Sequence, residues 1–165
     1  MKRSIFIVSV ILLISAGIFS ACKENEEDIR KIYSTKEGRF DLNENEFVTM
    51  WILPEEGTNN SSHILRIENH TEKVLQYGRE FSLEYLNKNN WKSISLHDVQ
   101  WELIVIGLNS DETTEEMIYF FPLIEKYNNN KNGQYRLTKI FSLIDFPLGD
   151  VVVSGIKLST EFEIK

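Results

Sequence analysis

The chain has 165 residues and a formal net charge of −7, and 42% of its residues are hydrophobic and 12% aromatic. This composition is typical of a globular protein and excludes a disordered one, and the length allows one domain with its own core. An acidic surface repels phosphate backbones, which argues against nucleic acid as a partner.

The first residues have the features of an export signal. Lys2 and Arg3 provide a positive start, and Ile5 to Phe19 is an uncharged run of 15 residues. This run is shorter than the roughly 20 residues that a membrane-spanning helix needs. We therefore expect residues 1–21 to be a cleaved secretory signal.

The end of this signal resembles the lipobox of bacterial lipoproteins. The small residues Ser20 and Ala21 directly precede Cys22, the only cysteine in the chain. In proteins with this motif the thiol receives a diacylglyceryl group and the chain is cut just before it. The resemblance implies that Cys22 is a lipidated N-terminus on the extracytoplasmic face of the cell membrane. An ordinary cleaved signal and an uncleaved anchor are the alternatives.

Cleavage before Cys22 would make the protein more acidic. It would remove two of the 18 basic residues and no acid, which leaves 16 basic and 25 acidic residues, a net charge of −9. Because such a surface repels anionic headgroups, the lipid itself would have to hold the protein at the membrane. We expect residues 22–45 to form an acidic tether, with a short helix at 23–32 as the alternative, and residues 46–165 to form the folded domain.

The rest of the chain consists of short β-prone runs separated by polar turns. The expected strands cover residues 47–53, 63–68, 81–86, 91–94, 101–106, 114–120, 134–141 and 156–164. One helical turn fits residues 123–127, and a tight hairpin turn fits residues 87–90. Strands at this spacing favour an all-β, antiparallel sandwich or barrel over a βαβ fold.

Alternation of side chains predicts which faces of these strands are buried, because successive residues of a strand point to opposite sides. In the strand at 63–68, His63, Leu65 and Ile67 share one face. In the strand at 134–141, the shared face carries Tyr135, Leu137, Lys139 and Phe141.

Several motifs follow one another in an order typical of a known family. They are Ile67-Glu-Asn-His-Thr-Glu-Lys73, Tyr77-Gly-Arg-Glu-Phe-Ser-Leu-Glu84, Trp91, Gly133-Gln-Tyr-Arg-Leu137 and Glu161-Phe-Glu-Ile164. From about residue 46 to residue 165 the chain thereby resembles the bacterial immunoglobulin-like domain of small lipoproteins and surface proteins. The resemblance implies an immunoglobulin-like antiparallel β-sandwich of about seven to nine strands. It also implies that Trp91 fills the space between the sheets and that the Tyr135 hydroxyl bonds backbone as in a tyrosine corner.

Neither the resemblance nor the residues predict an enzyme. Ser95, His97 and Asp98 are the residue types of a hydrolase triad, but neighbours in a strand or turn should point apart, and the chain has no Gly-x-Ser-x-Gly elbow. We therefore expect no catalytic site.

The candidate metal ligands are equally weak. His63, His70 and His97 lack the close spacing or cysteine partners of a structural zinc site. The acidic stretch around Asp111, which continues through Glu112, Glu115 and Glu116, lacks the calcium-loop pattern. No metal and no cofactor is expected.

One apolar segment is the candidate binding site. Between the last two strands, the sequence places Phe146 and Leu148 on a loop, followed by Val151 to Val153. Exposed apolar residues at the end of a sandwich can mark a partner site. In the alternative, Phe146 folds back onto the core and Val151 to Val153 extend the last strand.

Three function classes remain open. The first is a lipid-anchored, extracytoplasmic binding or accessory module without catalysis, which engages another envelope protein. The second is a lipoprotein that binds a small solute or a glycan, for which Trp51, Trp91 or Trp101 would have to be exposed on one face. The third is an enzyme with an unrecognised carboxylate or histidine site.

Overall fold

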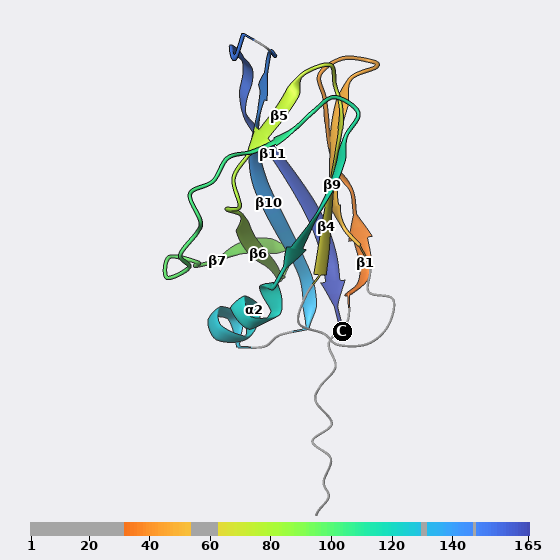
Figure 1. Cartoon of the computed structure of the whole chain (residues 1–165). Helices are drawn as coiled ribbons and strands as arrows, with labels where there is room; N and C mark the ends of the chain where they lie inside the picture. The colour runs from red at the N-terminus through yellow and green to blue at the C-terminus, as the bar shows by residue number, and fades with distance from the viewer. Residues whose placement is uncertain (1–31, 54–62, 130–131, 147) are drawn as a thin grey trace, which may run out of the picture.

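The computed structural model describes residues 32–53, 63–129, 132–146 and 148–165. The expected signal, the Cys22 lipidation site and the first part of the expected tether lie outside these residues. Within them, two antiparallel sheets pack face to face as a sandwich (Figure 1). The expected fold class, an all-β antiparallel sandwich, is confirmed.

We call the two layers the large sheet and the small sheet. The large sheet contains β1 (Ile32–Lys36), β5 (Val74–Tyr77), β6 (Ser82–Asn87), β7 (Asn90–Ile94), β8 (Ile106–Leu108), β10 (Gly133–Ile144) and β11 (Val151–Ile164). The small sheet contains β2 (Gly38–Asp41), β3 (Phe47–Ile52), β4 (His63–His70) and β9 (Thr113–Ile118). Seven strands in one sheet and four in the other exceed the seven to nine strands that we expected.

The long strand β10 organises the large sheet. Along its whole length β10 pairs with β11, and on its other side it pairs with two different strands. Its first half, at Tyr135 to Thr138, pairs with β6, and its second half, at Phe141 to Ile144, pairs with β5. The large sheet therefore divides along β10, with β6 and β7 at one end and β5 and β8 at the other.

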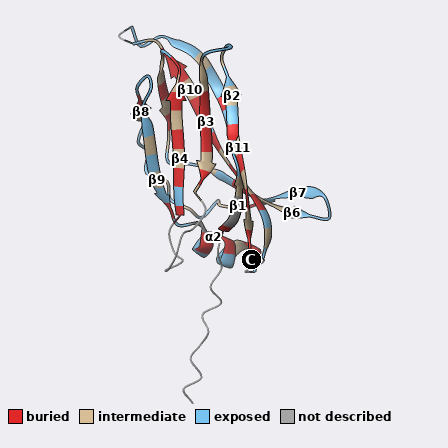
Figure 2. Ribbon diagram, turned by 90° about the vertical axis from the view of Figure 1, so that its right-hand side faces the viewer, coloured by how far each residue is buried: buried red, intermediate tan, exposed pale blue. Residues whose placement is uncertain are grey.

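The core lies between the two sheets, where the alternation of the sequence places it (Figure 2). In β4, His63, Leu65 and Ile67 are buried and the residues between them are not, as expected. The expected buried face of β10 is also confirmed: Tyr135, Leu137, Lys139 and Phe141 are each exposed by 1% or less. The period-2 pattern of these strands thus specified their buried faces.

Residues 32–41, which the sequence pattern assigned to the tether, belong to the sandwich. β1 pairs with β11, so that Ile32 lies opposite Ile164, and β2 pairs with β3. The expected start of the domain at residue 46 is therefore too late. The pattern missed these strands because both are short and lie at the edges of their sheets, where little of a strand is buried.

Gly38 allows the chain to pass from one sheet to the other. A Cβ atom at this position would lie 2.4 Å from the carbonyl oxygen of Ser159 in β11. Only glycine therefore fits this close approach of two backbones. The crossing ties the first strands of the domain to its last strand.

The segment from Trp101 to Val105 corrects another expectation. These residues are not in a strand, although their composition predicts one, and β8 begins only at Ile106. The β8 strand pairs with β5, whereas Leu103 is 93% exposed and Val105 75% exposed. Residues with a high strand propensity form a strand only where a neighbouring strand can hydrogen-bond to them and one of their faces can be buried.

Two local predictions agree better with the structure. The hairpin between β6 and β7 turns at Lys88 and Asn89, whose φ values of 47° and 65° are those of a type I′ turn. The expected helical turn at 123–127 is present but longer, as α2 (Phe120–Asn128). In the part of the chain that the structure describes, no helix has the length and hydropathy needed to cross a bilayer.

The buried side chain of Asn69 joins two turns at the same end of the sandwich. Its Nδ2 donates to the carbonyl oxygens of Lys73, Leu108 and Asn109 at 2.8–3.0 Å, and its Oδ1 accepts from both the backbone N–H and the hydroxyl of Thr71. One amide therefore satisfies carbonyl groups from the β4–β5 turn, from the end of β8 and from the residue after it. This explains why an asparagine is fully buried here.

Candidate functional site

The hairpin between β10 and β11 projects beyond the core. Phe146 is 82% exposed, Leu148 78%, Val151 60% and Val152 43%, and we call these four residues the β10–β11 tip. Phe146 does not fold back onto the core, whereas Val151 to Val153 do extend the last strand. The alternative considered from the sequence is thus wrong in placing Phe146 on the core, and it is confirmed in extending the last strand to Val151.

The base of this tip is well fastened. The backbone N–H of Asp145 donates to the Asp150 carbonyl at 2.9 Å, and Gly149, with a φ of 76°, donates to the Asp145 carbonyl at 2.8 Å. The ammonium of Lys73 lies 2.6 Å from the Asp145 carboxylate, which raises the pKa of Lys73. Asp145, which directly precedes the exposed Phe146, is therefore tied to the β4–β5 connection.

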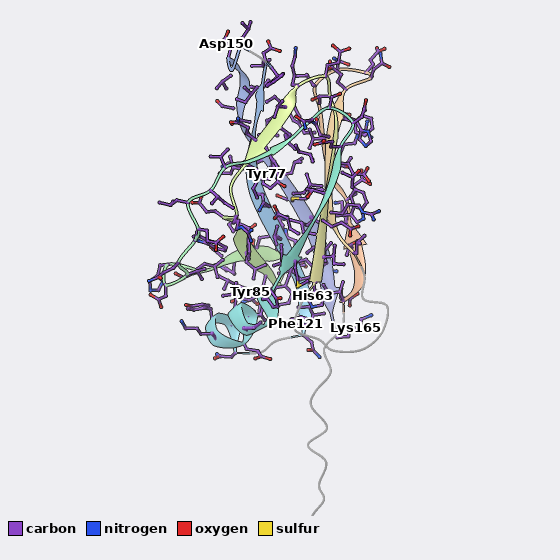
Figure 3. The ribbon with its side chains drawn as sticks, viewed as in Figure 1. His63, Tyr77, Tyr85, Phe121, Asp150 and Lys165 are labelled. Atoms are coloured by element: carbon purple, nitrogen blue, oxygen red, sulfur yellow. The ribbon has the colours of Figure 1, made fainter. Side chains whose placement is uncertain are left out.

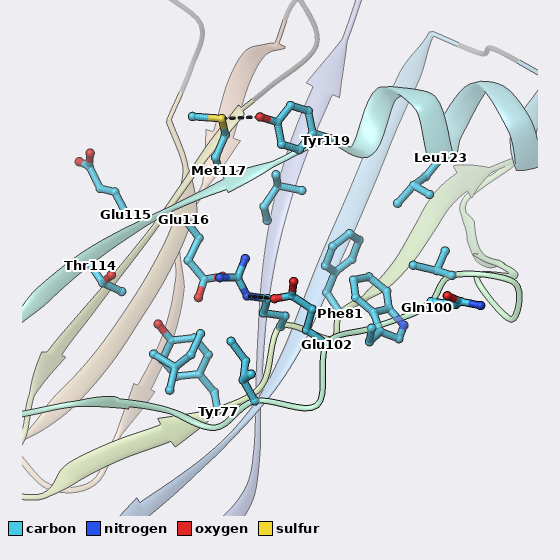
Figure 4. Close-up of a pocket in the computed structure, with 16 residues that line it drawn as sticks. Tyr77, Phe81, Gln100, Glu102, Thr114, Glu115, Glu116, Met117, Tyr119 and Leu123 are labelled. Carbon is cyan, nitrogen blue, oxygen red and sulfur yellow. Dashed lines mark hydrogen bonds and ion pairs between the residues drawn. The ribbon is translucent and has the colours of Figure 1, made fainter.

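A pocket of about 810 Å³ opens between β9 and residues 99–106 (Figure 4). Its walls are formed by the end of β5 with the residues that follow it, by residues of the 99–106 segment, and by β9. Leu123 of α2 also lines it. Because 101–105 are not in a strand, they stand off from the sheets and form one wall of the pocket.

A buried ion pair lies behind this pocket. The side chain of Lys139 is 1% exposed, and its Nζ donates to Oε2 of Glu116 at 3.1 Å. The same ammonium lies 5.1 Å from the centre of the Tyr77 ring. Burial lowers the pKa of Lys139, and the Glu116 carboxylate opposes that effect. The lysine on the apolar face of β10 is thus accommodated by one carboxylate and one aromatic ring.

Two oxygens beside the pocket are fully shielded from solvent. They are the Tyr77 hydroxyl, on a residue that is 4% exposed, and Oε1 of Glu116. Figure 4 shows the hydroxyl and the carboxylate on the same side of the pocket. Burial, and the neighbouring Glu116 charge, raise the pKa of Tyr77, so the phenol remains protonated. The hydroxyl interacts with the side chains of Glu116 and Thr114, so it belongs to the buried Lys139–Glu116 cluster rather than to the open surface of the pocket.

The other charged groups that line the pocket are paired. Arg79 contacts Glu102 at 3.1 Å, and Arg66 donates to Glu115 at 3.0 Å from its Nε. The ring of Trp101 packs against Phe81 with centroids 4.9 Å apart. The pocket therefore combines balanced charges with an aromatic wall.

The three tryptophans lie in three different places. Trp51 lies under the Arg66 guanidinium, and Trp91 lies 4.0 Å from that of Arg136. Only Trp101 lines the pocket. Trp91 in β7 pairs with Leu86 in β6, and paired residues point to the same face of a sheet. That face is the outer face of the large sheet. The expectation that Trp91 fills the space between the sheets is therefore wrong.

The expectation that Ser95, His97 and Asp98 point apart is also wrong. The Ser95 hydroxyl lies 2.7 Å from His97 Nδ1, and His97 Nε2 lies 2.9 Å from the Asp98 carboxylate. The imidazole and the carboxylate are, however, 71% and 52% exposed. These groups are therefore open to solvent, and they lack the dry, preorganised environment that makes a catalytic triad effective.

The candidate metal ligands are engaged elsewhere. In the described part of the chain, no three His, Cys, Asp or Glu side chains cluster in a way that could hold a metal ion. Glu112 accepts from Asn109, and Glu115 and Glu116 point to opposite faces of β9. His63 packs edge-on against Phe121, and His70 contacts Glu68.

The Tyr135 hydroxyl, expected to bond backbone, accepts a hydrogen bond from the side-chain amide of Asn128 at 3.1 Å. Asn128 is the last residue of α2, so this bond joins the helix to β10. Sequence reasoning did not single out Tyr77, Glu116 and Lys139 together, because they come from three strands. Lys139, a charged residue on the apolar face of β10, was the sequence feature that could have indicated this cluster.

Comparisons with known proteins found one family. A family model described as a bacterial Ig-like domain matches residues 44–163. The search of curated proteins found no match. A crystal structure of a protein from Archaeoglobus fulgidus aligns with 81% of this chain and 98% of its own, at 9% identity and a TM-score of 0.30.

Proposed function

Because the chain belongs to the bacterial Ig-like domain family, which is typical of extracellular and surface modules and typically non-catalytic, we propose that it is a binding module. In this proposal the protein is anchored by a lipid on Cys22 to the extracytoplasmic face of the cell membrane. It engages another envelope protein through the β10–β11 tip, and it catalyses no reaction.

The exposure of the tip is the observation that carries the proposal. Phe146 and Leu148 are 82% and 78% exposed, and the neighbouring residues Asp145, Gly149 and Asp150 make the bonds described above. Soluble domains seldom present large adjacent apolar side chains to water unless these contact a partner.

The position of the tip suits a membrane-anchored module. Asp150, beside the tip, and Lys165, at the C-terminus, lie at opposite ends of the sandwich (Figure 3). The described chain begins at Ile32, which pairs with Ile164, only ten residues after Cys22. β11 has 14 residues and so spans about 45 Å at the rise of a strand. A lipid on Cys22 would thus leave the tip facing away from the membrane, toward other envelope proteins.

The experiment is a crosslinking pull-down from intact cells that express the full-length protein. We expect the wild type to recover one envelope protein in stoichiometric amount. The double variant Phe146→Asp/Leu148→Asp should reduce that recovery at least tenfold while the thermal stability of the domain stays unchanged, since both side chains are exposed.

The matched control is Leu103→Asp/Val105→Asp, which places two charges on side chains that are equally exposed but lie outside the tip. This control should recover the partner as the wild type does. A folded Phe146→Asp/Leu148→Asp protein that retains the partner would contradict the proposed interface, as would loss of the partner in the control alone.

A further inference from the structure

We propose that the two walls of the pocket, β9 and residues 101–105, form the interface of a symmetric dimer. In this dimer, residues 101–105 of each copy lie against the free edge of β9 in a second copy of the chain. The interface is separate from the β10–β11 tip and leaves the tip open to an envelope protein.

The outer edge of β9 borders the pocket. Within the described ranges, β9 pairs with β4 and with no other strand. Its consecutive residues from Thr114 to Ile118 line the pocket, so residues of both of its faces do. A pocket that touches both faces of a strand lies along the edge of that strand, where unpaired N–H and C=O groups point. β9 can therefore accept a further strand.

The opposite wall offers a segment that could be this strand. Residues 101–105 are apolar and strand-prone, and no strand of the described chain pairs with them. Their backbone instead makes a short local turn, in which the Ile104 N–H donates to the Glu102 carbonyl at 2.9 Å. Leu103 and Val105 are exposed. An exposed apolar segment of this kind favours pairing with another chain.

The two walls do not pair within one copy, because both ends of the segment are held on the far side of the pocket. At one end, Ile106 pairs with Tyr77 of β5. At the other end, the Trp101 ring packs against Phe81 with centroids 4.9 Å apart. About 810 Å³ of open space separates the segment from β9. The strand that completes the β9 edge must therefore come from another molecule.

A twofold axis along the strands satisfies both walls at once. The turn at 109–112 joins β8 to β9, so residues 101–105, which lead into β8, run opposite to β9 (Figure 1). Rotation about an axis parallel to the strands keeps their directions. Residues 101–105 of one copy therefore meet β9 of the other in the antiparallel sense, and the symmetry makes this contact twice. Both tips then lie at the same end of the dimer.

Exposed apolar side chains flank both walls. On β9 and just after it, Met117 is 61% and Tyr119 55% exposed, and the Tyr119 hydroxyl donates to the Met117 sulfur (Figure 4). In the dimer these two side chains lie against Leu103 and Val105 of the second copy. Aromatic residues and methionine are enriched in protein interfaces, so the contact has a suitable composition.

The charges at the walls do not oppose this contact, although the chain has a net charge of −7. Glu102 pairs with Arg79, and Glu115 pairs with Arg66. Each carboxylate thus has a cation of its own copy beside it, which reduces repulsion between two copies of an acidic chain.

The test uses intact cells that express two differently tagged copies of the full-length protein. The photo-crosslinking amino acid benzoyl-phenylalanine replaces Leu103 in one copy. After irradiation, this copy is purified by its tag and the product is examined for the second tag. We expect one product with the mass of two copies, in which the crosslinked peptide of the second copy contains residues from 113–119.

Charge variants test the same contact without the photo-crosslinker. Leu103→Asp/Val105→Asp in both copies, or Met117→Lys in both copies, should reduce chemical crosslinking between the two tagged copies by about tenfold or more. Cells that express one copy of each variant should recover it, because opposite charges then meet at one contact and the other contact is unchanged. The melting temperatures should stay unchanged, since these side chains are exposed.

The matched control is Phe146→Asp/Leu148→Asp, which charges equally exposed side chains at the tip and should leave the dimer intact. Loss of the dimer and loss of the envelope partner are thereby distinguished. Four results would overturn the proposal. They are no product between the two copies, a crosslink from position 103 to another protein or to a part of the second copy outside 113–119, products of three or more copies, and no recovery in the mixed cells.

Discussion

His63 is an imidazole placed where water cannot reach it. It begins β4, is 3% exposed and packs edge-on against Phe121 at 4.5 Å between ring centroids (Figure 3). Burial lowers the pKa of His63 from 6.5 to about 4, because the charged imidazolium loses its hydration. The folded protein therefore prefers the neutral ring at every pH above that value.

This residue predicts a pH dependence of stability. The unfolded chain takes up a proton on His63 near pH 6.5, and the folded protein does so only near pH 4. The contribution of the neutral ring is therefore complete above pH 6.5 and is lost as the pH falls toward 4. The loss is on the order of 3 kcal/mol in the free energy of unfolding. Urea unfolding at intervals from pH 7.5 to pH 4 measures it.

His63→Phe should remove this part of the pH dependence, since a phenyl ring does not titrate. His97→Gln is the matched control, because the side chain of His97 is 71% exposed and folding takes little of it out of water. If wild type and His63→Phe lose the same stability between pH 6.5 and pH 4, the assignment to His63 is wrong.

At the scale of elements, the first two strands show how short edge strands are held in a sandwich. β1 lies at the edge of the large sheet and β2 at the edge of the small sheet, and Gly38 at the crossing touches the backbone of β11. The contact depends on the absence of a side chain. β1 is thereby held against the last strand of the domain, far away in sequence.

Gly38→Ala should destabilise the protein by about 1–3 kcal/mol, because a methyl group 2.4 Å from the Ser159 carbonyl oxygen forces two backbones apart. The loss should be concentrated in β1 and β2. Hydrogen exchange of the backbone amides should show faster exchange in those strands, and denaturant unfolding gives the total.

Gly107→Ala is the matched control. A Cβ atom at Gly107 would lie 3.5 Å from a methyl carbon of Val74, which is ordinary contact, and glycine within a strand has no side chain to pack. Its free energy of unfolding should change by no more than about 0.5 kcal/mol. Equal effects of the two substitutions would show that the close approach at Gly38 is not what makes the difference.

At the scale of the whole molecule, the proposed anchor and the proposed binding surface belong to opposite ends of the sandwich. The chain enters the described domain beside its C-terminus and presents the β10–β11 tip at the other end (Figure 1). Under our proposal, a lipid on Cys22 would hold the tip near other envelope proteins and raise its local concentration there.

Cys22→Ala tests the anchor. Without the thiol no diacylglyceryl group can be attached, so the protein should stay uncleaved, or be released to the medium if another peptidase cuts it. Fractionation of cells followed by mass spectrometry of the N-terminus distinguishes these forms. A Cys22→Ala protein that is cut before residue 22 and still fully retained in the membrane would contradict the lipoprotein assignment.

The order of residues by itself determined the β-sandwich and the buried faces of its long strands. β4 and β10 each alternate with a period of two, and a strand with that pattern can bury only one face. The turn at Lys88 and Asn89 was equally local, since a short polar link between two strands favours a type I′ hairpin. These features depend on neighbours in the chain, and so they could be predicted from the sequence.

Only the tertiary structure decided what the strands lie against. Tyr77, Glu116 and Lys139 come from three strands, and no spacing in the sequence brings them together. The 101–105 segment has the composition of a strand, but no ladder includes it, and it became a pocket wall instead. The physical reason is common to both cases. An alternating pattern specifies which side of a strand is apolar. The free energy of long-range pairing, in contrast, selects the partner strand and the sheet edges that stay unpaired.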